Sequence, residues 1–180
     1  MSKNDKSLSK KVGQLSMKVR QIILEFFFEH PQVSFAVREL TTKTGIKRST
    51  VQYYLTQLRK EGFVLSNNQW ADNWRNRVVK TNYYTEKISK TGLVEYLEEE
   101  LGASAIILFG SFRKGESAQE SDIDIFVECA REKTLDLRRF EKRLGHKIQL
   151  FVRPKITLLP KDLLNSVVNG IKLQGYFTIK

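Results

Sequence analysis

The first half of the chain repeats apolar residues with the period of an α-helix in three successive segments. These segments run from about 17 to 30, from 34 to 45 and from 47 to 62, and each carries apolar residues three and four positions apart. We expect Ser34 to cap the second helix and Gly62 to end the third. The positions expected to face the core are Val19, Ile22, Ile23, Phe26 and Phe27, then Phe35, Val37 and Leu40, and finally Val51, Tyr54, Leu55 and Leu58.

A β-hairpin is predicted after the third helix. Residues 63–70 and 77–85 are rich in aromatic and β-branched side chains, which favour strands. The loop between them, at about 71–77, carries Arg75 and Arg77. The expected architecture of the first half is therefore three helices followed by a basic hairpin.

The second half mixes helical and strand patterns. An amphipathic helix is expected at 91–102, and the apolar run 105–109 is expected to form a buried strand. A second strand begins at Ser121, a helix covers 134–145, and a third strand covers 147–152. Together with the helical first half, this pattern predicts an α+β chain that ends in a small domain with a mixed sheet.

Length and composition allow two small domains. The chain has 180 residues, of which 41% are hydrophobic, and this is enough for packed cores. No run reaches the roughly 18 apolar residues of a membrane-spanning helix, and the N-terminus lacks the apolar core of a secretory signal. We therefore expect a cytoplasmic protein without a membrane partner, whose single cysteine, Cys129, is a buried hydrophobe in a reducing compartment.

Positive charge is concentrated in the first half. The net charge is +11, and residues 1–87 hold 16 Lys or Arg against 7 Asp or Glu, whereas residues 88–180 hold 15 against 13. Residues 1–15 form a polar, basic leader that we expect to be disordered. A basic first half attached to a nearly neutral second half indicates that the first half binds a polyanion.

The second and third predicted helices form a helix-turn-helix candidate. A short turn at Gly45 joins them, and the third helix directs polar residues outward. Donors and cations on its first two turns can reach phosphates and base edges in the major groove of DNA. The residues that would make these contacts are Lys47, Arg48, Ser49, Gln52 and Tyr53, together with Arg75 and Arg77 of the hairpin.

Residues 16–87 resemble the winged helix-turn-helix family, through the run TGIKRSTVQYYLTQLRKEGFV. The resemblance implies binding to double-stranded DNA, with the helix that starts near Arg48 in the major groove and the 71–77 loop as a wing on the DNA backbone. Lys47 departs from the small capping residue that these proteins often have, and it adds a positive charge for phosphate. Winged helices also serve as protein-interaction or dimerisation modules, so a homodimer and a protein partner stay open.

Candidate chemistry in the second half centres on a glycine-serine turn and a pair of aspartates. Gly110 and Ser111 end the strand 105–109, and backbone N–H groups and a hydroxyl at such a turn can bind a triphosphate. Asp122 and Asp124 lie on one face of the next strand, because side chains alternate along it. The two carboxylates repel each other. Their proximity becomes favourable if both bind one Mg²⁺ ion that also binds phosphate oxygens. The pattern therefore describes a metal-dependent nucleotide site.

The run GSFRKG, separated by five residues from the run SDID, is similar to the minimal nucleotidyltransferases of the DNA polymerase β superfamily. The resemblance covers about 88–180 and implies transfer of a nucleoside monophosphate from a nucleoside triphosphate (NTP) to a hydroxyl group, with Mg²⁺ or Mn²⁺ as cofactor. It implies that Asp122 and Asp124 are catalytic and bind the metal. The residues that it implies for nucleotide binding are Gly110, Ser111, Lys114 and Ser121.

A glutamine replaces the third carboxylate that the family would supply. Alternation along the strand 147–152 puts Gln149 at the position of the acid. Glutamine is neutral, so it cannot act as a general base and it binds a metal less well than aspartate does. Other groups are expected to lie too far along the strand or at the surface, namely Glu128, Glu141 and His146.

Two functions from different classes follow. The first is a nucleotidyltransferase that is targeted or regulated through a DNA-binding winged helix, and the intact Gly-Ser turn and aspartate pair favour it. The second is a transcriptional regulator or antitoxin-like repressor whose transferase-like domain is inactive and serves as a nucleotide sensor or assembly module. Gln149 and the charge asymmetry favour this second function. In both cases the domain boundaries are expected at 16–87 and 88–180.

Overall fold

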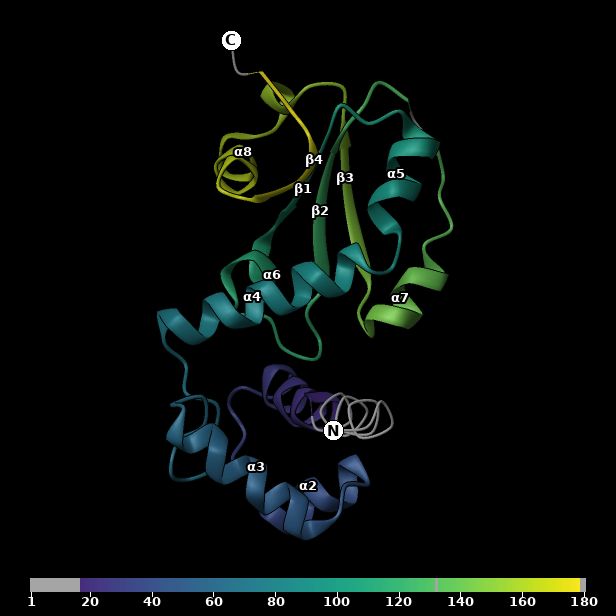
Figure 1. Cartoon of the computed structure of the whole chain (residues 1–180). Coiled ribbons are helices and arrows are strands. Elements are labelled where there is room, and N and C mark those ends of the chain that lie inside the picture. The colour runs from purple at the N-terminus through teal and green to yellow at the C-terminus, as the bar shows by residue number, and fades with distance from the viewer. Residues whose placement is uncertain (1–16, 132, 179–180) are drawn as a thin grey trace, which may run out of the picture. The chain divides into compact units, whose positions relative to one another are not determined.

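The computed structural model of the chain describes residues 17–131 and 133–178. The chain divides into two units, Met1–Asn73 and Trp74–Lys180, and Figure 1 shows the helices of the first and the sheet of the second. The predicted α+β fold class is confirmed. The leader predicted for 1–15 lies outside the described residues.

The first unit is built from three helices whose apolar faces form its core. The helices cover 17–29, Val37–Thr44 (α2) and Arg48–Lys60 (α3). The core positions predicted for α3 are all buried, so the helical period identified its inward face. The buried positions are Ile23, Leu24, Phe27 and Phe28 in the first helix, Phe35 and Leu40 around α2, and Val51, Tyr54, Leu55 and Leu58 in α3.

The buried face of the first helix is turned by one position from the predicted one. Ile22 is 46% exposed, whereas Leu24 is 7% exposed and Phe28 is 1% exposed. Phe28 packs edge-on against Trp70, with the ring centroids 5.0 Å apart. The sequence holds two overlapping apolar stripes, and contact with this distant tryptophan selects the one that contains Phe28.

The start of α2 differs from its prediction, whereas the end of α3 agrees. α2 begins after Ala36 and not after Ser34. The reason is that the Phe35 backbone N–H donates to the Asn68 carbonyl (3.0 Å), which keeps this stretch extended. Gly62, with φ of 79°, follows the last turn of α3 and ends it as predicted.

A short hairpin follows α3, and it closes earlier than predicted. Val64 and Trp70 form an antiparallel bridge, and the Leu65 N–H donates to the Gln69 carbonyl (2.8 Å). The hairpin therefore lies within 63–71, almost entirely inside the stretch that was predicted to be its first strand.

The segment predicted as the second strand of the hairpin, 77–85, is helical. It lies within α4, Trp74–Ser89, which belongs to the second unit. The boundary between the units falls after Asn73 instead of after residue 87. Aromatic and β-branched residues suggested a strand, but the buried positions recur every four residues, as in a helix: Asn76, Lys80, Tyr84 and Ile88.

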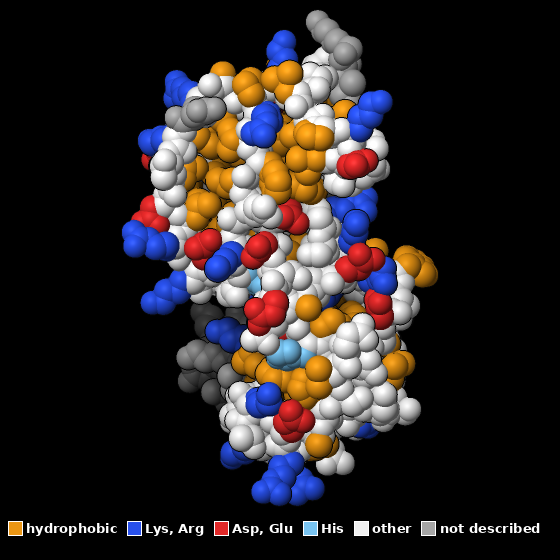
Figure 2. Space-filling view, turned by 180° about the vertical axis from the view of Figure 1, so that it is seen from behind, with side chains coloured by type: hydrophobic (Ala, Val, Ile, Leu, Met, Phe, Trp, Pro, Cys, Tyr) orange, Lys and Arg blue, Asp and Glu red, His pale blue; other side chains and the backbone are white. Residues whose placement is uncertain are grey.

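This boundary removes the predicted charge asymmetry. Arg75 and Arg77 lie on α4 and not on a hairpin loop. Residues 1–73 hold 12 Lys or Arg and 6 Asp or Glu, and residues 74–180 hold 19 and 14, so the units carry net charges of +6 and +5. On the face shown in Figure 2, Lys and Arg side chains are interspersed with Asp and Glu. The second unit is therefore not the nearly neutral one that was predicted.

The second unit is organised around a four-stranded mixed sheet. Across the sheet the strands are β3 (Ile148–Arg153), β2 (Ile123–Glu128), β1 (Ala105–Phe109) and β4 (Ile171–Gly175). β1 runs antiparallel to β2 and β4, whereas β2 and β3 run parallel. Every residue of β1 is buried, as expected of a strand with helices on both faces.

Helices cover both faces of this sheet. α8 (Lys161–Val168) packs apolar side chains against a cluster that includes Ile107 and Phe126 on one face. Figure 1 shows α5 (Leu93–Leu101) and α7 (Arg138–Leu144) on the other side. The remaining short helices are α6 (Gly110–Lys114) and the 3-10 helix η1 (Ile156–Leu158).

Two further expectations concern Cys129 and membrane-spanning helices. Cys129 is buried, with 6% of its surface exposed, as predicted for a small hydrophobe. Each helix in the described part of the chain is too short or too polar to cross a membrane.

Candidate functional site

The surface of α3 presents the polar residues that were predicted to contact DNA. α2 and α3 are joined by a turn that starts at Gly45, whose φ is 68°. A polar helix surface after such a turn is the geometry with which helix-turn-helix proteins enter the major groove. The predicted residues that are exposed on this surface are Lys47, Arg48, Ser49, Gln52 and Tyr53.

The tip of the hairpin, 66–68, is polar but uncharged. Asn68 has a positive φ of 60°, and its side-chain oxygen accepts a hydrogen bond from Arg59 Nε (3.1 Å). This bond ties the last turn of α3 to the tip. Arg75 and Arg77 lie on α4, so the prediction of a basic wing is wrong. Their predicted contact with the DNA backbone rested on that wing and loses its basis.

Gly110 and Asp124 come together because β1 and β2 pair antiparallel. The register puts Phe109 opposite Asp124, so the turn after Phe109 starts beside the carboxylate. Gly110 has φ of 69°, and a methyl group on its Cα would lie 1.9 Å from Asp124 Oδ2. Glycine is thus required twice, for the backbone conformation and for the close approach. Ser111, the next residue, is half-buried.

The aspartates lie on the side of the strand that alternation predicted. Ile123 and Ile125 are both 0% exposed, while Asp122 is exposed and Asp124 is half-buried. Burial raises the pKa of the Asp124 carboxyl above its ordinary value, and the neighbouring charge of Asp122 raises this pKa further. The site therefore concentrates negative charge that a cation would stabilise.

Gln149 is the neighbour of Asp124 in the sheet. The parallel register of β2 and β3 pairs Asp124 with Gln149. Register partners in adjacent strands point to the same side of a sheet, and the Gln149 side chain is exposed there. The register therefore agrees with the position predicted for Gln149.

The oxygen atoms at this end of the sheet suit a magnesium ion. Asp122 and Asp124 supply carboxylates that already repel each other, and Mg²⁺ takes one or two carboxylates together with water and phosphate oxygens. Within 17–131 and 133–178, no group of three or more His, Cys, Asp or Glu side chains is placed to hold a metal. The donor set fits a cation shared with phosphate.

Ser121 and His146 brace the segment before the aspartates. Ser121 Oγ accepts a hydrogen bond from the Ala118 N–H (2.9 Å), and the Ser121 carbonyl lies 3.0 Å from His146 Nδ1. His146 is 6% exposed and packs edge-on against Phe112, so the surface position expected for it is wrong. Lys114 is exposed at the end of α6. Nucleotide contacts of Ser121 and Lys114 stay predictions.

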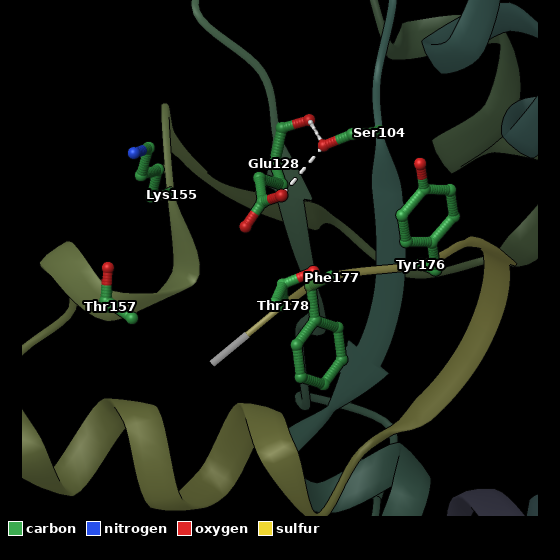
Figure 3. Close-up of a pocket in the computed structure, with 7 residues that line it drawn as sticks. All are labelled: Ser104, Glu128, Lys155, Thr157, Tyr176, Phe177 and Thr178. Atoms are coloured by element: carbon green, nitrogen blue, oxygen red, sulfur yellow. Dashed lines mark hydrogen bonds between the residues drawn. The ribbon is translucent and has the colours of Figure 1, made fainter. Parts of the chain in front are cut away.

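Glu128 lies at the opposite end of β2 from the aspartates. Its carboxylate accepts hydrogen bonds from the Ser104 hydroxyl (2.8 Å) and the Ile156 N–H (2.7 Å). Figure 3 shows the hydrogen bonds between Glu128 and Ser104. Both residues line a pocket of about 460 Å³. Glu141 is half-buried instead of solvent-facing, and it accepts a hydrogen bond from the Ile148 N–H (3.0 Å). Both glutamates therefore have structural partners.

Comparison with protein-family models gives two matches. Residues 23–67 match the IclR helix-turn-helix domain, and residues 90–173 match the nucleotidyltransferase domain. The chain joins a helix-turn-helix domain to a nucleotidyltransferase domain. Both resemblances inferred from the sequence motifs are confirmed. A comparison with curated proteins gave no match, and neither did one with solved structures.

α4 is the element that sequence reasoning missed. It falls between the two matched ranges, although it is part of the same unit as the nucleotidyltransferase domain. Its inward face carries Asn76, Lys80 and Thr81, all of which are buried. The spacing of four residues between the buried positions of α4 was the signal in the sequence. A pattern based on hydrophobicity did not detect it, because several of these positions hold polar residues.

Asp124→Asn is expected to raise the stability of the ligand-free protein. The change removes a carboxylate whose ionisation is opposed by burial and by Asp122. Below the ordinary pKa of 3.8 both proteins carry a neutral group here and should be equally stable. As the pH rises through 3.8 and then through the raised pKa, the wild type loses stability relative to the variant. We expect a gain of about 0.5 kcal/mol at neutral pH and low salt, measured by thermal unfolding across the acid range.

Asp136→Asn is the matched control, with the opposite sign. Hydrogen bonds from Arg138 lower the pKa of Asp136 to about 2. This variant should be less stable than the wild type at neutral pH, and the difference should vanish as the pH falls through that value. Destabilisation by Asp124→Asn at neutral pH would contradict the repulsion assigned to the aspartate pair.

Proposed function

We propose that this chain is a DNA-binding protein whose nucleotidyltransferase domain binds a nucleoside triphosphate together with Mg²⁺ or Mn²⁺. The observation that carries the proposal is the close approach of Gly110 to the Asp124 carboxylate. It unites a backbone turn suited to phosphate with a carboxylate suited to metal. The exposed polar surface of α3 supports the DNA-binding part.

Gly110 and Ser111 are the proposed triphosphate ligands. The Ser111 hydroxyl and the backbone N–H groups of the turn donate hydrogen bonds to phosphate oxygens. Asp122 and Asp124 hold the divalent cation, which when bound neutralises charge between the carboxylates and the phosphates. The remaining proposed nucleotide ligands are Lys114 and Ser121.

Gln149 favours nucleotide binding over transfer. Its amide is the sheet neighbour of Asp124, at a position where a carboxylate would accept the proton of an attacking hydroxyl. An amide does not accept a proton at neutral pH. We therefore assign the domain to nucleotide sensing in a transcriptional regulator. Transfer of a nucleoside monophosphate to a hydroxyl acceptor is the second candidate, and the retained pair of Asp122 and Asp124 favours it.

The whole 180-residue chain is expected to bind at least one Mg-NTP in calorimetric titrations with each of the four common NTPs. Gly110→Ala should weaken this binding by a factor on the order of ten or more, because the added methyl group would meet Asp124 Oδ2 at 1.9 Å. Gly145→Ala is the matched control, since Gly145 also has a positive φ (83°) but has open space around it. Equal binding by Gly110→Ala and the wild type would contradict the proposed site.

Gln149→Asp is expected to increase transfer from a labelled NTP to an acceptor. The change puts a proton acceptor and a third anionic ligand beside Asp124, and a general base contributes a factor on the order of a hundred or more. Gln149→Asn is the neutral control and should leave the rate unchanged. If the wild type transfers label as fast as Gln149→Asp, sensing is the wrong assignment and the second candidate function replaces it.

Arg48→Ala is expected to weaken binding of a mixed-sequence DNA duplex by a factor on the order of ten. Loss of a phosphate contact should also reduce the slope of log affinity against log salt by about one. Lys60→Ala is the matched control, because Lys60 is an exposed cation at the far end of α3. Fluorescence anisotropy over a salt series measures both quantities. Equal losses in the two variants would contradict an interface at the start of α3.

A further inference from the structure

The inward face of α4 is polar and buried. Asn76 and Lys80 are 0% exposed, and Thr81 is 8% exposed. Burial of polar side chains costs free energy unless they form hydrogen bonds. α4 also lies outside both matched domain ranges. The partners of its polar face therefore indicate what the helix does.

Lys80 and Thr81 bind the backbone that follows the glycine-serine turn. Lys80 Nζ donates a hydrogen bond to the carbonyl of Ser117. Thr81 Oγ1 is within hydrogen-bond distance of the carbonyls of Phe112 (3.3 Å) and Arg113 (3.1 Å). Two adjacent residues of α4 thus reach three carbonyl groups of one short segment.

Close packing accompanies these hydrogen bonds. A methyl group on Gly115 would lie 2.4 Å from the Arg77 carbonyl oxygen, so glycine lets the segment touch the α4 backbone. The Arg77 side chain forms an ion pair with Glu116. Tyr84 packs edge-on against Phe112, with the ring centroids 4.8 Å apart. The segment is therefore fixed by backbone contact, charge and ring packing together.

The segment held by α4 links the two halves of the candidate nucleotide site. The held segment, 112–117, follows Ser111 of the proposed phosphate turn and leads through 118–121 to Asp122, the first of the proposed metal carboxylates. Apolar packing is non-directional, whereas a hydrogen bond fixes the position of one acceptor atom. The polar face of α4 therefore determines where individual atoms of this segment lie.

We propose that Lys80 and Thr81 are positioning residues of the nucleotide site. By holding the segment 112–117 they set the geometry between Ser111 and Asp122 in which Mg-NTP binds. The inference rests on the proposed nucleotide binding, and it assigns a role to a helix outside both matched ranges.

Substitutions of Thr81 in the whole 180-residue chain test this role. Thr81→Val keeps the shape of the side chain and removes the hydroxyl, while Thr81→Ser keeps the hydroxyl. Thr85→Val is the matched control, because the Thr85 hydroxyl donates to the Thr81 carbonyl within the same helix (2.9 Å). Two readouts are compared: calorimetric affinity for the NTP that the wild type binds best, and hydrogen–deuterium exchange of peptides covering 112–121 without nucleotide.

Thr81→Val is expected to bind Mg-NTP more weakly by a factor on the order of ten and to exchange faster over 112–121. Thr81→Ser and Thr85→Val should behave like the wild type in both readouts. Lys80→Met should act in the same direction as Thr81→Val, and if it does not fold, the Thr81 variants decide.

Wild-type affinity in Thr81→Val would overturn the inference, as would an equal loss in Thr85→Val, which would mean general weakening of α4. If the wild type binds none of the NTPs, the proposed nucleotide binding fails. The exchange data then still decide whether Thr81 holds the segment 112–117, since unchanged exchange over 112–121 in Thr81→Val would show that it does not.

Discussion

The antiparallel pairing of β1 with β2 is the constraint on which the candidate site depends. It puts Phe109 opposite Asp124, so the chain leaves β1 at Gly110 directly beside a carboxylate. The space between them is too small for a methyl group, and the positive φ of Gly110 favours glycine independently. The glycine-serine turn and the aspartate strand are therefore one structural unit, and the ladder of the sheet holds it together.

The parallel pairing of β2 with β3 decides how much negative charge this unit carries. Gln149 is the neighbour of Asp124, and an acid there would add a third charge to a pair in which burial and Asp122 already raise the pKa of Asp124. With glutamine instead of an acid at position 149, the ligand-free site has less repulsion between carboxylates. A cation would then have one anionic ligand fewer, and an acceptor hydroxyl would have no general base at this position. The proposed phosphate ligands, Gly110 and Ser111, do not include Gln149, so the proposal separates nucleotide binding from transfer.

The strands β1, β2 and β3 and the helix α3 could be predicted because their signals are local and apolar. Ile123 and Ile125 alternate with the aspartates, and alternation along 147–152, together with the resemblance to nucleotidyltransferases, predicts Gln149 at the position of the third acid, next to Asp124. The start of α2 could not be predicted in this way. It depends on the hydrogen bond between the Phe35 N–H and a hairpin carbonyl, and that partner is distant in sequence.

α4 could not be predicted because its buried face is polar. Asn76 and Lys80 occupy positions where a helical pattern requires apolar residues, so the neighbouring aromatic and β-branched residues favoured a strand. The partner of Lys80, the Ser117 carbonyl, lies 37 residues further along the chain, and only the tertiary fold reveals it. The hydrophobic effect is non-directional, so it does not by itself select the position of one carbonyl group. Hydrogen bonds from Lys80 and Thr81 fix three carbonyl groups of the segment 112–117, and the proposed nucleotide site depends on this positioning.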